Sequence, residues 1–383
     1  MDKNKLCKHL NSLYDIMIIV EKASPVICGY NCKLVILQFI KVKEYSCMTN
    51  TVKWNVLDFV VRDKGKSDRE AYADTLALVK TAEDLGYHRF WFAEHHSLAA
   101  YPSAAPEILM THFLSQTKRL KFGSGGVMLP HYAPLKVAEV FATIAHLYPG
   151  RVDLGMGNNP GRQAVREALD NNLKGYRDNE EAMGEVRDFL TQTASSYGDV
   201  QVYPRAETPP TLWTLSASEE SAYKAARLGI GYVYSLLFNQ DEDAIEVAGR
   251  IAKIYRDNFQ ASATLAKPQF MVSAFIAVVP EGTDIKPLQR AFDLWILGKK
   301  DYSEFDHLPT IDEAANYKFT QPDLVKIARN RKKLITGDIR QVKIQIDRII
   351  DVTAADEFMV IPTVPGIESR QEHLALIAQA FDI

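Results

Sequence analysis

The sequence lacks long apolar runs, a strong net charge and an amino-terminal segment with the layout of a signal peptide. Apolar stretches such as 16–20 and 34–40 are too short to span a bilayer. The net charge of −3 over 383 residues gives no electrostatic basis for binding nucleic acid or an anionic membrane. Hydrophobic residues at 47% and charged residues at 24% are ordinary globular values. We therefore expect a cytoplasmic protein that binds neither nucleic acid nor membranes.

Cysteine is scarce, and its distribution is uneven. The four cysteines all precede Met48, at Cys7, Cys28, Cys32 and Cys47. They could form a metal site or a disulfide pair, but the gap between Cys28 and Cys32 and the irregular outer spacings fit zinc poorly. The interpretation we favour is that 1–47 lies outside the domain, because the first clear fold signal begins at Trp54. It could be an unusual extension or sequence translated upstream of a true start at Met48. The predicted domain is therefore 48–383.

From Trp54 onward, strand patterns alternate with helix patterns. Eight apolar runs predict strands at 54–61, 88–93, 120–129, 151–157, 211–215, 232–237, 269–279 and 357–363. This alternation predicts an α/β fold, a (β/α)8 TIM barrel. The chain is longer than a typical barrel of about 250 residues. Most of the excess lies at 280–356, which we expect to be an insertion between strands 7 and 8 that acts as a lid.

Capping boxes predict where two of the helices begin. Ser67 with Glu70 opens the first helix, which is expected to end at Gly86. Its helical spacing predicts a buried face made of Tyr72, Leu76, Val79 and Ala82. Ser369 with Glu372 is expected to open the last helix.

The strand predicted at 120–129 has three glycines, Gly123, Gly125 and Gly126. Glycine weakens a strand because it has no side chain to pack. Three glycines in one strand therefore indicate that something flat lies against the backbone there. The next helix begins at Pro134, in a first turn where the missing N–H is not needed.

In a (β/α)8 barrel the chemistry lies at the carboxyl ends of the strands. This rule selects Glu94-His95-His96 after strand 2, Ser124-Gly125 in strand 3, 157–159 after strand 4 and Ser216-Ala217-Ser218 after strand 5. The last segment precedes a helix, so its hydroxyls and the free N–H groups could bind a phosphate. The same two serines could equally do no more than cap that helix.

Glu94-His95-His96 is open to more than one interpretation. Adjacent side chains at a strand end point to opposite sides, so the two histidines are not expected to share a metal ion. They could donate hydrogen bonds to a cofactor or move protons near neutral pH. They could also form a polar cluster at the barrel rim, but their position favours a functional role. No metalloprotease, P-loop or hydrolase-elbow motif occurs, and a Rossmann glycine pattern is incomplete after Gly155-Met-Gly157.

Three segments in order resemble the bacterial luciferase-like monooxygenase family. They are Phe90-Trp-Phe-Ala-Glu-His-His96, Gly123-Ser-Gly-Gly-Val-Met-Leu-Pro-His131 and Leu147-Tyr-Pro-Gly-Arg-Val-Asp-Leu-Gly155. The resemblance runs from about Trp54 to the carboxyl terminus. It implies a barrel that binds FMN, reduced by a separate reductase, and that uses molecular oxygen to oxidise a small organic substrate. It also implies a homodimer through the helices at 106–117 and 134–148.

The resemblance assigns expected roles to the strand-end residues. Glu94, His95 and His96 match the pocket beside the flavin, and the Ser124–Gly125 bond matches a cis peptide beneath its ring. Ser216, Ala217 and Ser218 match the segment on the phosphate side. Family members often have an arginine where this chain has Asn158. We expect Arg162, four residues further on, to replace it in part.

Two other functions stay open at this stage. One is a deazaflavin-dependent oxidoreductase on the same barrel, and the other is a flavin-binding protein without turnover. The intact Glu94-His95-His96 segment speaks against the second. The resemblance implies neither a particular substrate nor light emission.

Overall fold

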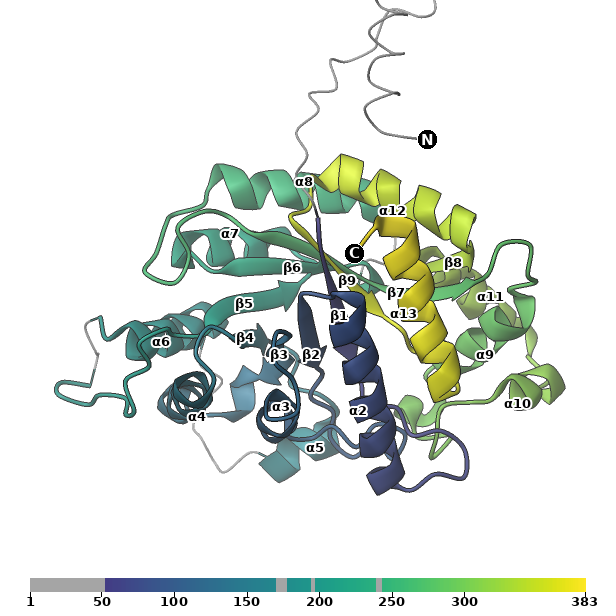
Figure 1. Ribbon diagram of the computed structural model, residues 1–383, viewed down its shortest axis with the longest axis horizontal. Helices are drawn as coiled ribbons and strands as arrows, with labels where there is room; N and C mark the ends of the chain where they lie inside the picture. Colours follow the sequence, from purple (N-terminus) through teal and green to yellow (C-terminus); the bar gives the residue numbers. More distant parts are fainter. Residues whose placement is uncertain (1–51, 170–177, 194–196, 239–242) are drawn as a thin grey trace, which may run out of the picture. The chain divides into compact units, whose positions relative to one another are not determined.

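The computed structural model describes residues 52–169, 178–193, 197–238 and 243–383 (Figure 1). The predicted extension at 1–47 lies outside the described residues, so its separation from the domain stays a prediction. Within the described ranges, no helix combines the length and the apolar character needed to cross a membrane.

Eight parallel strands close into a barrel, as predicted. In order around it they are β1 (Lys53–Asp58), β2 (Arg89–Phe92), β3 (Lys121–Met128), β4 (Val152–Gly157), β5 (Thr211–Ser216), β6 (Gly231–Ser235), β7 (Phe270–Val279) and β9 (Glu357–Ile361). Each strand pairs with the next, and β9 pairs with β1 to complete the ring. The (β/α)8 prediction is confirmed.

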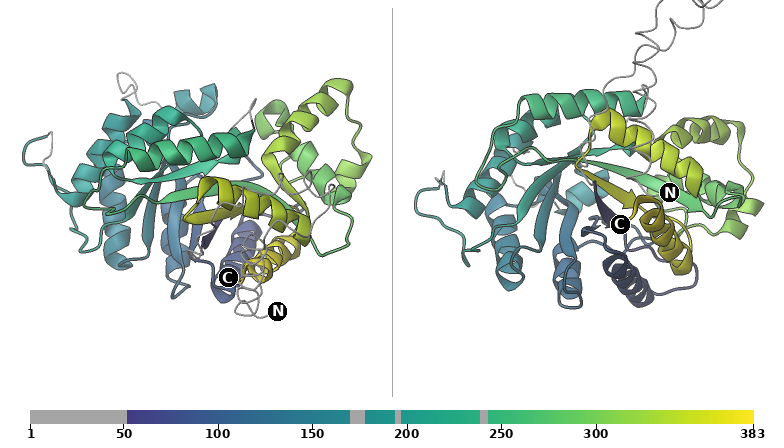
Figure 2. Two further views of the ribbon diagram at one scale, coloured as in Figure 1. Left: turned by 90° about the horizontal axis from the view of Figure 1, so that it is seen from above. Right: turned by 45° about the horizontal axis from the view of Figure 1, so that its top comes forward.

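Helices surround the barrel on its outer side (Figure 2). They are α2 (Asp68–Leu85), α3 (Pro106–Leu114), α4 (Pro134–Leu147), α6 (Asn179–Thr191), α7 (Glu219–Leu228), α8 (Ala244–Asp257), α12 (Ile339–Thr353) and α13 (Ile367–Phe381). The short α5 (Gln163–Leu169) follows β4, and its Val165 lines a cavity instead of the core under this layer. Between the strands and this layer lies the main apolar core, built from side chains such as Val56, Phe90, Phe122 and Leu154. The carboxyl ends of the strands are thereby held in one ring.

The predicted insertion contains a strand that the sequence pattern did not reveal. It holds α9 (Lys286–Ile296), α10 (Ile311–Asn316), α11 (Gln321–Asn330) and β8 (Leu334–Asp338). β7 is long enough to pair twice: Met271–Phe275 pairs with β9, and Phe275–Val279 pairs with β8. β8 was missed because only its first two residues are strongly apolar. It joins the insertion to the barrel by main-chain hydrogen bonds.

The first helix begins and ends as predicted, and of its predicted inner face Val79 and Ala82 are buried and Leu76 packs against the core, whereas Tyr72 does not. Ser67 and Glu70 form the capping box, and Gly86 ends the helix in the left-handed conformation. Tyr72 is exposed rather than buried, and its hydroxyl donates to Pro102 O at 2.9 Å. The buried stripe includes Thr75, whose hydroxyl donates to the buried carboxylate of Asp58 at 3.1 Å. That hydrogen bond helps to set the rotation of α2.

The start predicted for the last helix at Ser369 is wrong. α13 begins at Ile367, and Gly366 occupies the N-cap position. The Gly366 N–H donates to Asp63 Oδ1 at 2.8 Å, and the buried Arg370 pairs with Asp63 Oδ2 at 2.9 Å. These bonds fix the N-cap three residues earlier, at Gly366 instead of Ser369. Ser369 therefore lies inside the first turn, where its carbonyl accepts from His373 Nδ1.

A buried ion-pair cluster joins strands inside the barrel. Arg89 on β2 pairs with Asp153 on β4 and, at 2.8 Å, with Glu357 on β9. Asn55 on β1 donates to Glu357 at 2.9 Å, and the Trp91 indole donates to Asp153 at 3.1 Å. Burial alone would raise the pKa of Glu357, but the charge of Arg89 outweighs it and holds that pKa below its usual range. Glu357 and Arg89 therefore keep their charges at neutral pH.

We predict that Arg89→Met lowers the free energy of unfolding by about 3–5 kcal/mol, because it leaves two buried carboxylates without their cation. Arg348→Met is the matched control. Arg348 pairs with Asp243 on the surface at 3.2 Å, both side chains are about half exposed, and such pairs contribute about 0–1 kcal/mol. Urea unfolding followed by circular dichroism measures both. Equal midpoints for the two variants would show that the cluster does not stabilise the barrel.

Candidate functional site

A cavity of about 520 Å³ lies at the carboxyl ends of the strands. Of the residues predicted for the site, five line it: Glu94, His95, His96, Gly125 and Arg162. Ser124, Asn158, Ser216, Ala217 and Ser218 are not among its lining residues. Its size falls within the range of about 300–1,000 Å³ that is usual for small-molecule sites. The strand-end rule therefore located the cavity but not its full lining.

Glu94 is held by three hydrogen bonds at the end of β2. Its Oε1 accepts from the Tyr132 hydroxyl at 2.6 Å and from His96 Nε2 at 2.7 Å. Its Oε2 accepts from the Met128 N–H at 2.8 Å. The carboxylate is buried, and both oxygens are occupied by groups of the protein. Glu94 thus orients His96 and connects the loop after β2 to the end of β3.

His95 and His96 differ in their surroundings. The ring of His95 packs against Phe59, with 4.7 Å between centroids, and its Nδ1 shares a hydrogen bond of 3.3 Å with the Ser103 hydroxyl. Burial lowers the pKa of His95 to about 4, so its ring is neutral at pH 7. His96 instead directs Nε2–H to Glu94. A neutral His96 therefore keeps Nδ1 as an acceptor.

The glycines of β3 are required for different physical reasons. A Cβ on Gly123 would lie 2.4 Å from the Trp91 indole nitrogen, so packing inside the barrel requires this glycine and no ligand is needed to explain it. A Cβ on Gly126 would lie 2.8 Å from Gly155 O of the neighbouring strand. Gly125 and Gly126 line the cavity. A flat group against the backbone stays a prediction for these two positions.

The cis peptide predicted at Ser124–Gly125 lies one bond further on, at Gly125–Gly126. The pairing of β3 with β4 shifts register there, since Gly125 pairs with Gly155 and Val127 with Met156. Gly126 is therefore the extra residue of a bulge. Ser124 is in regular strand, where its hydroxyl donates to Gly155 O at 2.8 Å and accepts from Gly155 N.

The segment predicted to bind phosphate caps a helix. Ser218 is the N-cap of α7, and its hydroxyl accepts from the Ser221 N–H at 3.2 Å. The Ser218 N–H donates to Ser216 Oγ at 3.3 Å. These hydrogen bonds agree with the capping interpretation. They do not test whether the same segment also binds an anion.

Arg162 is the only arginine or lysine among the described residues that line the cavity. Its Nη2 donates to Ser97 O at 2.8 Å, directly after the two histidines. Within the described ranges, no group of three or more His, Cys, Asp and Glu residues could hold a metal ion. Arg162 is thus the only fixed positive charge available to an anionic ligand in this lining.

Sequence reasoning missed the aromatic lining of the cavity. Phe59, Tyr101, Phe275, Trp295 and Tyr302 all border it. Phe59 directly follows β1, so the strand-end rule, which was applied to polar residues, would have found it if extended to aromatic ones. Trp295 and Tyr302 come from the insertion, far along the chain from the residues predicted for the site. No sequence pattern indicated that they reach the cavity.

The residues present fit a flavin. The cavity has the volume for a planar ring, backbone at Gly125 and Gly126 offers a wall without side chains, and Arg162 supplies a positive charge. A neutral His95 and an oriented His96 stand at the same cavity. This arrangement can bind a ring, donate hydrogen bonds and move a proton.

Comparison with known proteins identifies the family. A family model described as luciferase-like monooxygenase matches residues 54–348. The uncharacterized protein YceB of Bacillus subtilis (strain 168) is 34% identical over 339 residues, covering 85% of this chain and 98% of its own length. A luciferase-like monooxygenase of Escherichia coli (strain K12) is 33% identical and covers 81% of this chain and 91% of its own.

The solved structure of apo-MsnO8 has a TM-score of 0.76 at 29% identity and covers 87% of this chain and 98% of its own. Sequence and fold comparisons thus agree over the whole barrel. The chain belongs to the luciferase-like monooxygenase family.

Proposed function

We propose that this protein is an FMN-dependent monooxygenase that uses reduced FMN and molecular oxygen to oxidise a small organic substrate. The observation that carries the proposal is the cavity at the strand ends, which combines the Gly125–Gly126 backbone with His95, His96 and Arg162. Family membership supports the oxidoreductase class. When bound, reduced FMN supplies the two electrons for oxygen reduction.

In this proposal, each side chain has a physical task. His95 is neutral at pH 7 and serves as a hydrogen-bonding group rather than a cation. His96, oriented by Glu94, takes or gives a proton at Nδ1, which faces away from its bond to the carboxylate. Apolar side chains such as Leu57, Phe59 and Ile361 exclude water from the reacting groups.

The phosphate of FMN requires partners at the cavity mouth. We propose that Arg162, Ser216, Ala217, Ser218 and the amino terminus of α7 would hold it. Asn158, exposed after β4, would contribute at most a neutral hydrogen bond where relatives often have a positive charge. Reduced FMN would be supplied by a separate reductase.

We also propose a homodimer through α3 and α4, the helices within 106–117 and 134–148. Ile108 on α3 is 66% exposed and Leu147 on α4 is 59% exposed. Exposed apolar side chains of this kind suit a protein interface. Within the predicted insertion at 280–356, the part before β8 would act as a lid, since Trp295 and Tyr302 border the cavity, whereas α12 belongs to the helix layer around the barrel.

A deazaflavin-dependent oxidoreductase is the alternative. Solved structures with this fold include a monooxygenase constituent in complex with FMN, at 16% identity, and an F420-dependent secondary alcohol dehydrogenase, at 14% identity. These likenesses are of fold alone. The comparison therefore leaves the cofactor to experiment.

The proposed function is tested with purified protein, FMN and coenzyme F420. We expect reduced FMN to bind without oxygen, and its spectrum after oxygen is admitted to change at a rate different from that of free reduced FMN. Binding of F420 with no effect on FMN oxidation would favour the alternative. Binding of FMN without any change in its oxidation would indicate a flavin-binding protein without turnover.

We predict that His95→Ala or His96→Ala lowers the rate of substrate oxidation about 10²-fold or more, because the first removes the proposed hydrogen-bonding group and the second the proposed proton-transfer group. Single-turnover absorbance of bound flavin measures it. Because the pKa of His95 is about 4 and its charged form is disfavoured by burial, removing His95 should not alter the pH profile above pH 5. Unchanged kinetics in both variants would show that the pair is only a polar cluster at the rim.

We predict that Arg162→Ala weakens FMN binding by about 10- to 150-fold and leaves riboflavin binding unchanged, since charge-assisted hydrogen bonds contribute about 1.5–3 kcal/mol. Asn158→Arg should strengthen FMN binding. Arg166→Ala, on the exposed side of α5, is the control. Fluorescence titration with FMN and with riboflavin measures the two affinities. An FMN affinity of Arg162→Ala equal to that of the parent protein would contradict the assignment of Arg162 to the phosphate.

A further inference from the structure

One side of the cavity is a continuous set of aromatic rings. We call Phe59, Tyr101, Phe275, Trp295 and Tyr302 the aromatic wall. Ring centroids lie 5.6 Å apart for Phe59 and Tyr101, 5.7 Å for Phe59 and Phe275, and 5.2 Å for Phe275 and Trp295. Edge-to-face pairs at these distances are favourable. The wall therefore presents a fixed apolar surface to whatever shares the cavity with the cofactor.

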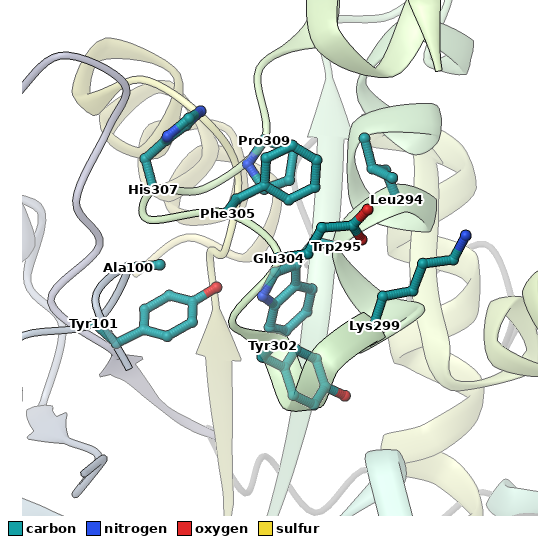
Figure 3. A pocket seen from close by; sticks show the side chains of 10 residues that line it. All are labelled: Ala100, Tyr101, Leu294, Trp295, Lys299, Tyr302, Glu304, Phe305, His307 and Pro309. Carbon is teal, nitrogen blue, oxygen red and sulfur yellow. The ribbon is translucent and has the colours of Figure 1, made fainter. Parts of the chain in front are cut away.

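Two polar atoms of the aromatic wall have no partner. Within the part of the chain that the structure describes, neither Tyr101 Oη nor Trp295 Nε1 has a hydrogen bond, although both atoms are buried. Tyr101 is 3% exposed and Trp295 is 9% exposed. Figure 3 shows the hydroxyl of Tyr101 and the indole nitrogen of Trp295 pointing toward one another. Leaving such groups unpaired costs about 1–3 kcal/mol each.

Both atoms are suited to donate. An indole N–H has no acceptor capacity, and a tyrosine hydroxyl is a donor while it is protonated. Burial raises the pKa of Tyr101 well above its usual range, and the Trp295 N–H, which points toward its oxygen without forming a hydrogen bond of normal geometry, lowers it by a smaller amount. Tyr101 is therefore protonated at neutral pH. Together the two groups suit a ligand that brings an acceptor oxygen.

The charged groups near the aromatic wall are already paired with other groups. Lys299 donates to the Tyr317 hydroxyl at 2.8 Å and to Asp323 at 2.9 Å. Glu304 accepts from the same tyrosine at 3.2 Å. His95, which packs against Phe59 and Tyr101, is neutral at pH 7 because burial lowers its pKa to about 4. A ligand with a charge at this end would find no free counter-charge, and burying an unpaired charge is costly.

Tyr302 is the part of the aromatic wall best placed to shift. It is 41% exposed, and its ring packs on Trp295 at 5.8 Å. Lys300 and Tyr302 have φ of 48° and 65°, a region that residues other than glycine rarely adopt. With Tyr101 and Trp295, it borders both the cavity and a smaller pocket of about 20 Å³ (Figure 3). A shift of this turn would open the two donors to a ligand.

We propose that the aromatic wall is the substrate subsite and that it takes a neutral, mainly apolar molecule with one acceptor oxygen, such as a ketone. Tyr101 Oη–H and Trp295 Nε1–H both donate to that oxygen, and the remaining rings hold the apolar part. The assignment rests on the proposed function, since it names the substrate class for the same cavity. It leaves Arg162 and the phosphate-side segment to the cofactor.

Binding is tested without flavin, using two pairs of probes that differ only in exchanging C=O for C=CH₂. The pairs are acetophenone with α-methylstyrene and cyclohexanone with methylenecyclohexane. Ligand-observed NMR gives each dissociation constant. We expect at least one ketone to bind about 5- to 150-fold more tightly than its hydrocarbon, the effect of two neutral hydrogen bonds. Absence of that preference in both pairs would overturn the proposal.

Substitutions at Tyr101 and Trp295 test whether these two side chains cause the ketone preference. Tyr101→Phe and Trp295→Phe should each reduce the ketone preference, and the double variant should abolish it. Phe59→Leu is the control, because it removes a ring without a polar atom and should weaken ketone and hydrocarbon alike. A ketone preference that is the same in the double variant as in the parent would overturn the assignment of these donors.

The thermal stability of the Tyr101→Phe variant tests the proposal independently of ligand binding. Tyr101→Phe should keep or raise the melting temperature, because it removes a buried oxygen that has no partner. A fall of more than about 5 °C would show that the hydroxyl stabilises the fold, and would overturn the proposal. Failure of the parent protein to bind FMN would contradict the proposed function. The ketone preference is measured without flavin, so its absence would contradict the assignment of the substrate subsite instead.

Discussion

A buried arginine shared by two carboxylates holds the barrel together from inside. Arg89 connects β2 to Asp153 on β4 and to Glu357 on β9, and Asn55 extends the network to β1. Buried charges must be paired, so these strands can only close in the register that brings the partners together. The paired residues lie toward the amino ends of their strands. The carboxyl ends are left to form the cavity, as in other barrels of this kind.

The site depends on a second, smaller network of the same sort. Glu94 accepts from Tyr132, His96 and the Met128 N–H, so one carboxylate fixes the loop after β2 against the end of β3. This bond set places His96 and the Gly125–Gly126 backbone at one cavity. The insertion adds Trp295 and Tyr302, held to the barrel through the pairing of β8 with β7. Backbone, imidazoles and aromatic rings therefore meet without a metal ligand set among the described residues.

Much of the fold follows from local pattern. Apolar runs predicted all eight barrel strands, and the capping box at Ser67 predicted the start of the first helix. Both signals depend on only a few neighbouring residues. The features that were predicted wrongly or missed depend on contacts with residues far away in the chain. Ser369 matched a capping box, yet Asp63, far away in the chain, fixes the helix at Gly366. β8 forms by pairing with β7, which no local pattern encodes, and the cis bond that the family resemblance implied at Ser124–Gly125 lies at Gly125–Gly126.

The site was predictable where polar residues follow a strand, as for Glu94, His95 and His96. It was not predictable where aromatic residues of the insertion come to the cavity, as for Trp295. We propose that this cavity binds the flavin ring, and a crystal structure of the protein with FMN would test this proposal. The ring is expected inside the cavity, against Gly125 and Gly126 and beside His95 and His96. A ring bound elsewhere on the protein would contradict it.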